Sequence, residues 1–190
     1  MNTQTIESLI ATLAAKHTSG FCPKEDAVYL DWVNNFISFD KFCEINMMES
    51  AFATDLIDRA RVAHEEYVAA IKSFELMDEQ SLWLCYEIDA NPADCTTENH
   101  DFYGLTVYSV DGAEYAVGTD READDAWDQS LESYIDECIM PEIKDENLRN
   151  YFDCEKWKRD AKHDGRGHSL ASYDGNEIEL GGGFAAFRIN

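Results

Sequence analysis

The sequence has few basic residues and no long apolar run. Its 190 residues include 15 Lys and Arg against 39 Asp and Glu, which gives a formal net charge of -24. Proteins that bind nucleic acids or anionic membranes use Lys and Arg to displace counterions, so we expect this chain to bind neither directly. No segment approaches the roughly 18 apolar residues of a membrane-spanning helix. The first 16 residues also lack the basic segment of a signal peptide, so we expect a cytoplasmic protein.

Motifs that identify common metal sites and enzymes are also missing. The six cysteines form no Cys-x-x-Cys pair, which favours reduced, partly buried thiols over zinc ligands or disulfides. The sequence contains no His-Glu-x-x-His, Gly-x-Ser-x-Gly or Gly-Lys-Ser/Thr string. We therefore expect no metal, no cofactor and no enzymatic activity.

The chain nevertheless has the composition of a folded protein, with 45% hydrophobic and 12% aromatic residues. Its acidic excess is concentrated in the middle. Residues 81–155 contain 20 acidic and 3 basic residues, whereas residues 156–190 contain 5 and 6. Solubility alone would not require this concentration, so the middle segment is the candidate interaction surface.

Apolar residues at helical spacing predict that residues 1–80 form a helical N-terminal part. A first helix lies near the N-terminus. Pro23 suits the first turn of a second helix. A third helix, capped by Ser38 or Asp40, is expected to run toward Phe74.

From Ser81 onward the pattern becomes typical of strands. The Asp111-Gly112 pair predicts a type I′ hairpin turn, because both central residues of that turn need positive φ. Strands are expected over 81–88, 105–110, 114–117 and 184–189.

Two helices are expected after the hairpin. The string Thr-Asp-Arg-Glu at 119–122 fits a capping box. It predicts a helix from Asp120 to about Met140, stopped by Pro141. A further short helix is expected over 146–161.

The fold class that follows is α+β. A helical N-terminal half (1–80) precedes a small antiparallel sheet with an acidic helix and a C-terminal strand (81–190). We expect the two parts to form one compact domain.

Acidic residues recur at every fourth position of the predicted acidic helix, with no Lys between them. They lie about 6 Å apart along the axis, which approaches the phosphate repeat of a nucleic-acid strand. Each like-charged i,i+4 contact disfavours a helix by about 0.2 to 0.5 kcal/mol, so something should offset that cost. One interpretation is a surface that imitates a nucleic-acid backbone; the alternative is a solvated face that keeps the protein soluble. The candidate partner-binding acids are Asp120, Asp124, Asp125, Asp128, Glu132 and Asp136 in the helix, and Glu87, Asp89, Asp94, Glu98 and Asp101 before it.

The segment His163–Glu177 contains two Asp-Gly turns around a polar and aromatic stretch. One interpretation makes His163, Asp164 and His168 an acid–base group or metal ligands, but their spacing matches no established template. We favour a structural role as a buried polar cluster. Its expected members are Asp164, Arg166, His168, Tyr173 and Asp174.

An enzyme acting on nucleic acid would normally carry a basic track. Here basic residues cluster in only one segment, just before His163. We expect them to neutralise neighbouring acids or to anchor the C-terminal helix. They are Lys156, Lys158, Arg159 and Lys162.

Two strings, AVGTDREAD at 116–124 and DGRGHSLASYDG at 164–175, resemble small acidic proteins that recur in bacteriophage and prophage genomes. The resemblance implies an accessory viral protein made in a bacterial cytosol. Strongly acidic viral proteins of this kind include antirestriction and anti-CRISPR inhibitors.

We therefore expect a counter-defence inhibitor that imitates nucleic acid and blocks a basic, nucleic-acid-binding complex of the bacterial host. A protein-binding module that acts on host transcription or replication machinery is the first alternative. A small hydrolase is less favoured. A homodimer is compatible with the sequence.

Overall fold

The computed structural model describes residues 5–18 and 50–190. It divides the chain into two compact units, Met1–Met77 and Asp78–Asn190. The predicted second helix at Pro23, and the proposed caps Ser38 and Asp40 of the third, lie outside the described residues.

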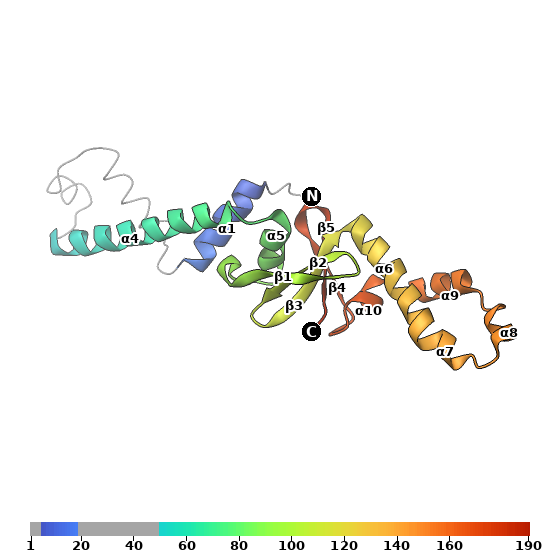
Figure 1. Ribbon diagram of the computed structural model, residues 1–190. Coiled ribbons are helices and arrows are strands. Elements are labelled where there is room, and N and C mark those ends of the chain that lie inside the picture. Colours follow the sequence, from blue (N-terminus) through green and yellow to red (C-terminus); the bar gives the residue numbers. More distant parts are fainter. Residues whose placement is uncertain (1–4, 19–49) are drawn as a thin grey trace. The chain divides into compact units, whose positions relative to one another are not determined.

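The first unit contains two described helices, α1 (Ile6–His17) and α4 (Ser50–Phe74), which pack together (Figure 1). The hydroxyl of Thr5 accepts a hydrogen bond from the amide of Ser8 (3.3 Å) and so caps α1. The structure confirms a helix near the N-terminus and one that ends at Phe74.

The second unit is built on a five-stranded antiparallel sheet with the strand order β1-β2-β3-β5-β4 (Figure 1). The α+β class is confirmed. Strands β2, β3 and β5 were predicted, whereas β1 and β4, at the two edges, were not. The strands are β1 (Cys95–Phe102), β2 (Leu105–Val110), β3 (Ala113–Thr119), β4 (Glu177–Leu180) and β5 (Phe184–Arg188).

Tight hairpin turns connect β1 to β2 and β2 to β3. Asp111 (φ 51°) and Gly112 (φ 80°) adopt the left-handed conformation that a type I′ turn needs, as predicted. Tyr103 (φ 52°) and Gly104 (φ 85°) do the same between β1 and β2.

The predicted strand over 81–88 is wrong, because this segment lies in a helix, α5 (Glu79–Glu87). The carboxylate of Asp78 accepts a hydrogen bond from the amide of Ser81 (2.9 Å) and caps it. All residues from Ser81 to Cys85 are buried. A helix that is buried on most sides has no polar face. Its hydrophobic pattern therefore cannot be distinguished from that of a buried strand.

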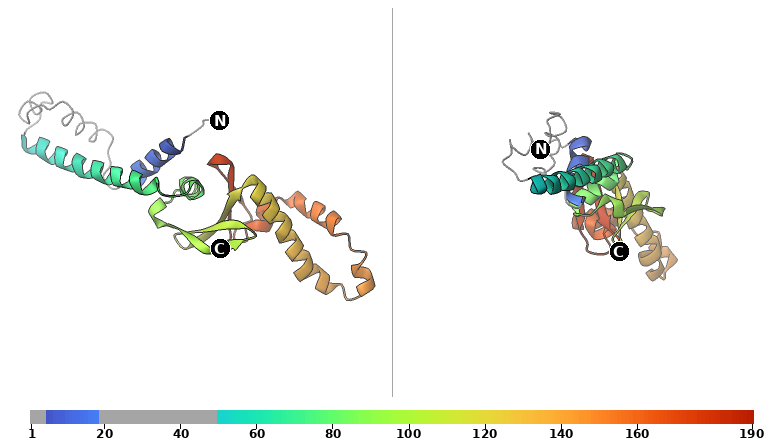
Figure 2. Two further views of the ribbon diagram at one scale, coloured as in Figure 1. Left: turned by 45° about the horizontal axis from the view of Figure 1, so that its top comes forward. Right: turned by 90° about the vertical axis from the view of Figure 1, so that its left-hand side faces the viewer.

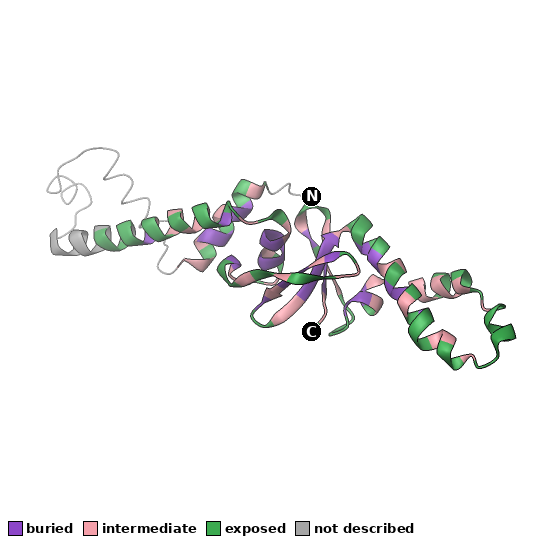
Figure 3. Cartoon of the chain, viewed as in Figure 1, coloured by how far each residue is buried: buried purple, intermediate pink, exposed green. Residues whose placement is uncertain are grey.

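The sheet has helices on both faces. Tyr108 lies on one face, where its hydroxyl donates a hydrogen bond to Asp78 at the start of α5 (2.8 Å). Helices α6 and α10 cover the other face, and Figure 3 shows that burial is concentrated in the strands and the adjoining helix surfaces. The core on that second face contains Leu105, Ala116, Ala123, Ala126, Leu170, Ala171, Ala185 and Phe187.

The chain between β3 and β4 forms an arm in which α9 packs against α6 (Figure 2). A π-helical turn, η2, follows α6 and leads directly into α7, which contains Pro141. The arm's elements are α6 (Asp120–Tyr134), η2 (Ile135–Ile139), α7 (Met140–Glu142), α8 (Glu146–Arg149), α9 (Cys154–Ala161), η3 (Lys162–Asp164) and α10 (Arg166–Leu170).

Two boundaries differ from the predictions. Pro141 does not stop the helical run, which continues to Glu142. The expected helix over 146–161 is divided into α8 and α9, because Asp145 and Asp153 each cap a separate helix.

Within residues 5–18 and 50–190, no helix combines the length and apolar character needed to cross a lipid bilayer. The free thiols in these ranges are Cys85, Cys95, Cys138 and Cys154.

Candidate functional site

The acidic helix begins where the sequence predicts. The hydroxyl of Thr119 accepts a hydrogen bond from the amide of Glu122 (3.3 Å), and the Glu122 carboxylate accepts one from the amide of Thr119 (2.8 Å). These two bonds form the predicted capping box. Hydrogen bonds from the backbone and hydroxyl of Thr119 hold the pKa of Glu122 below its ordinary value. The box fixes the first turn and the direction in which the following acids project.

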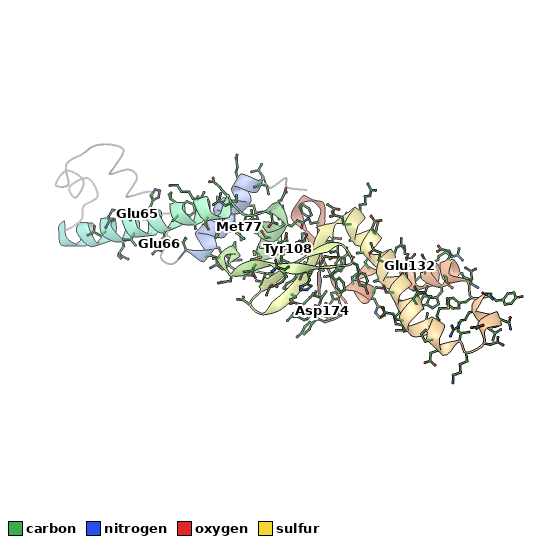
Figure 4. All side chains as sticks on the ribbon, in the orientation of Figure 1. Glu65, Glu66, Met77, Tyr108, Glu132 and Asp174 are labelled. Carbon is green, nitrogen blue, oxygen red and sulfur yellow. The ribbon has the colours of Figure 1, made fainter. Side chains whose placement is uncertain are left out.

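Three cations from the C-terminal part of the arm contact the first four acids of the row. Lys158 Nζ lies 2.9 Å from Glu132 Oε1, and Lys162 Nζ lies 2.6 Å from Asp128 Oδ1. Figure 4 labels Glu132 beside α9. The prediction that Lys158 and Lys162 neutralise neighbouring acids is confirmed. Although α6 carries no Lys between its acids, cations distant in sequence supply the missing compensation.

Arg166 completes the arrangement at the start of α6. Its guanidinium lies 3.1 Å from both Asp120 Oδ1 and Asp124 Oδ1, donates to the carbonyl oxygen of Asp120 (3.1 Å), and contacts the carboxylate of Glu177. Burial works to lower the pKa of Arg166, but the hydrogen bonds to Glu177 and Asp120 outweigh it and raise the pKa. We call these seven arm residues the ladder: Asp120, Asp124, Asp128, Glu132, Lys158, Lys162 and Arg166.

The ladder has its carboxylates outside and its cations beneath them. Its four acidic side chains are 49 to 74% exposed, whereas the three basic side chains are 11 to 34% exposed. Each carboxylate therefore keeps a solvent-facing side while a cation fixes its position. Hydrogen bonds to Glu132 and Glu155 raise the pKa of Lys158, which keeps that cation charged.

The regular row ends after Glu132. Asp136, which was expected to continue it, lies in the π-helical turn η2 and is exposed. Asp125 is exposed on α6 and lies outside the ladder. These two acids are thus exposed on the arm and can contact a partner, although they do not belong to the ladder.

The other candidate acids lie on different elements. Glu87 ends α5, Asp94 lies in η1 (Pro92–Asp94), and Glu98 lies on β1. Asp89 adopts a left-handed backbone conformation (φ 61°). The carboxylate of Asp101 accepts a hydrogen bond from the amide of Gly104 (2.8 Å), so it stabilises the β1–β2 turn.

The expected buried polar cluster after His163 is only partly correct. Arg166 is held by ion pairs, but His168 and Tyr173 are exposed, so no such buried cluster forms around them. The Tyr173 ring instead packs against Arg188, whose Cζ lies 3.7 Å from the ring centroid. Asp174 accepts a hydrogen bond from the amide of Asn176 (2.9 Å) and shapes the second Asp-Gly turn.

A cavity of about 420 Å³ lies in the arm, between α6 and η2 on one side and α9, η3 and α10 on the other. Asp164 and His168 line it, and His163 is not among the described residues that do. No group of three or more His, Cys, Asp or Glu side chains in the described part of the chain could hold a metal ion. The aromatic wall of this cavity, from Tyr103, Tyr134 and Trp157, was not predicted from the sequence.

A signal for the ladder is present in the sequence. The cations Lys158, Lys162 and Arg166 recur at every fourth residue, the same spacing as the acids. The pairing is antiparallel, since Glu132 meets the first of these cations and Asp124 the last. Matched spacing of opposite charges in two segments therefore predicts such a contact.

No protein-family model, curated protein or solved structure matches the chain.

Proposed function

We propose that the arm binds a basic, nucleic-acid-binding complex of a bacterial host and competes with nucleic acid for it. In this proposal the protein is a phage-encoded counter-defence inhibitor of the anti-CRISPR or antirestriction type, acting in the host cytoplasm. It uses no cofactor.

The observation that supports this proposal is the position of the ladder's charges. Its carboxylates face solvent at intervals of about 6 Å along α6, and partly buried cations hold them in place. A partner that grips phosphates with Lys and Arg can form the same charge-assisted hydrogen bonds to carboxylates. Because the carboxylates are already ordered, binding them costs less conformational entropy.

The cations do not cancel the negative charge of this surface. Counting Glu155 and Glu177, which also contact Lys158 and Arg166, six carboxylates surround three cations. Asp125, Asp136 and Glu137 add further exposed acids on the same helical run. The excess favours a basic partner and rapid, salt-sensitive association.

Action on host transcription or replication machinery would use the same surface, and the identity of the captured partner distinguishes it from counter-defence. A hydrolase is less supported, because Asp164 and His168 line the cavity without His163.

Affinity capture followed by competition tests the proposal. Tagged full-length protein is used to capture host proteins, and each captured nucleic-acid-binding protein is purified with a labelled oligonucleotide bound. The full-length acidic protein should displace the labelled oligonucleotide from the captured host protein in a fluorescence-anisotropy assay. Capture without displacement would contradict nucleic-acid mimicry.

A variant that tests the arm's charge in this competition must leave the ladder intact. We therefore choose Asp125→Asn with Asp136→Asn, which removes two exposed charges from the arm. The matched control, Glu7→Gln with Glu75→Gln, removes two exposed charges from the first unit. The arm variant should displace the oligonucleotide more weakly than the control. Equal displacement would show that only overall charge matters.

A further inference from the structure

The cavity in the arm has an aromatic wall. Tyr103, Tyr134 and Trp157 line it. The rings of Tyr134 and Trp157 are stacked, with centroids 5.7 Å apart and planes inclined by 9°. At about 420 Å³, the cavity falls in the range of about 300 to 1,000 Å³ that is typical of small-ligand sites. It is therefore large enough for a side chain from another molecule.

The charges that line the cavity are negative. Glu137 and Asp164 line it, and both are exposed. Neither Lys nor Arg is among the described residues that do so. A concave site lined by one sign of charge concentrates ions of the opposite sign. Phosphates and carboxylates are therefore disfavoured, and a cation is favoured.

A flat cation suits this wall better than a compact one. A guanidinium stacks on aromatic faces, is weakly hydrated, and forms directed hydrogen bonds to carboxylates, whereas an ammonium is a strongly hydrated point charge. The chain already contains this chemistry, since Arg188 lies 3.7 Å from the centroid of the Tyr173 ring. The aromatic wall and the carboxylates of Glu137 and Asp164 together favour a guanidinium ligand.

We propose that this cavity accepts an arginine side chain of the basic partner, with the guanidinium against Trp157 and paired with Glu137 or Asp164. This inference rests on the proposed function for the origin of the arginine, but not for the chemistry of the cavity. Helix α9 supplies both Trp157 to the cavity and Lys158 to the ladder. A partner on the ladder could thus place one arginine in the cavity while others contact the ladder.

Peptide titration of the full-length protein tests the site without the partner. The probe is a blocked Gly-Arg-Gly peptide, and its control is the same peptide with citrulline, the neutral isostere of arginine. In ¹H–¹⁵N spectra, the arginine peptide should shift the indole signal of Trp157 in a saturable manner. The dissociation constant of the arginine peptide should be about tenfold lower than that of the citrulline peptide. The neutral citrulline side chain can make neither the cation–π contact nor the ion pair. Equal affinities would overturn the proposal.

Two variants locate the binding. Glu137→Gln removes a charge from the cavity, whereas Glu142→Gln removes an exposed charge from α7, outside the cavity. The first should weaken arginine-peptide binding several-fold and the second should leave it unchanged. If both weaken it equally, the peptide binds the general acidic surface and the site is rejected.

The peptide titration and the displacement assay distinguish the arginine site from nucleic-acid mimicry. If the arginine peptide binds the cavity but the protein fails to displace an oligonucleotide, the arginine site stands and nucleic-acid mimicry is rejected. If displacement succeeds while the peptide does not bind, the arginine site alone is rejected.

Discussion

Lys158 Nζ lies 2.9 Å from Glu132 Oε1, although 26 residues separate the two in the chain. The lysine side chain is only 11% exposed, whereas the glutamate is 62% exposed. The cation thus lies below the surface and the carboxylate on it. This contact fastens α9 to α6 and fixes the end of the acidic row.

Replacing Lys158 by Met should destabilise the second unit. The substitution keeps an unbranched side chain but leaves Glu132 and Glu155 without their cation. We expect a loss of about 1 kcal/mol in the free energy of unfolding, near the upper limit for exposed pairs because this lysine is largely buried. Urea denaturation followed by circular dichroism measures it. Lys156→Met, at an exposed position on the same helix, should be near neutral, and equal effects would contradict a specific role for Lys158.

Amide substitution of the ladder acids should lower stability. Repulsion within the row alone would predict a gain, but the structure shows that the acids hold three cations. The lost ion pairs outweigh the relieved i,i+4 repulsion, with a net loss of about 1 kcal/mol. The variant is Asp120→Asn, Asp124→Asn, Asp128→Asn and Glu132→Gln.

A control with the same change in charge isolates the role of the ladder. It should be as stable as the parent protein or slightly more stable. Thermal unfolding of both variants at low and high salt provides the comparison, and a ladder variant more stable than the control would refute the prediction. The control is Asp125→Asn, Asp136→Asn, Glu137→Gln and Glu142→Gln.

Removing the capping hydroxyl should weaken α6. Thr119→Ala loses the bond to the amide of Glu122 and should cost about 1 kcal/mol, whereas Thr119→Ser should retain most of the stability. Because its pKa is lowered in the fold, Glu122 stabilises the protein above its unfolded pKa of about 4.3, and this contribution is lost as the pH falls through the folded value. Only part of the lowering of the Glu122 pKa comes from the hydroxyl, because the backbone amide of residue 119, the larger cause, still donates in Thr119→Ala. An NMR titration should therefore show a small rise in the pKa of Glu122 in this variant, and an unchanged pKa would indicate that the hydroxyl makes no contribution.

Tyr108 should make the fold sensitive to alkali. Burial and its hydrogen bond to Asp78 raise the pKa of Tyr108 above its ordinary value. Its stabilising effect is therefore complete below pH 10, near the unfolded pKa, and is lost as the pH rises toward the folded value. Tyr108→Phe should cost about 1 kcal/mol at pH 7 and should reduce the fall in stability between pH 9 and 11. Urea denaturation at pH 9 and at pH 11 measures this fall in stability, and Tyr173→Phe, at an exposed position, is the control.

Local signals in the sequence predict the hairpin and the acidic helix. Asp111-Gly112 and the capping box at Thr119 each need only a few adjacent residues, and both are confirmed. The edge strand β1 escaped prediction because its exposed residues are mostly polar and show no apolar alternation. Helix α5 was mistaken for a strand because it is buried on most sides.

The features that the sequence did not predict depend on long-range contacts. The pairing of Lys158 with Glu132 and the aromatic wall at Trp157 depend on how the arm folds back on itself. The sequence indicates the charges and the rings, but not which of them meet. The matched four-residue spacing of cations and acids is the one signal that connects the two segments.

The π-helical turn η2 gives the arm a place that can absorb a change of one residue. Each residue of an α-helix rotates the chain by about 100°, so a deletion within α6 would turn the acids beyond it away from their cations. A π-helical turn closes its hydrogen bonds over one more residue than an α-turn does. Deleting one residue between Ile135 and Ile139 would therefore restore an α-turn and leave the ladder acids upstream in place. The length of the helical run could thus change at η2 while Lys158 still meets Glu132.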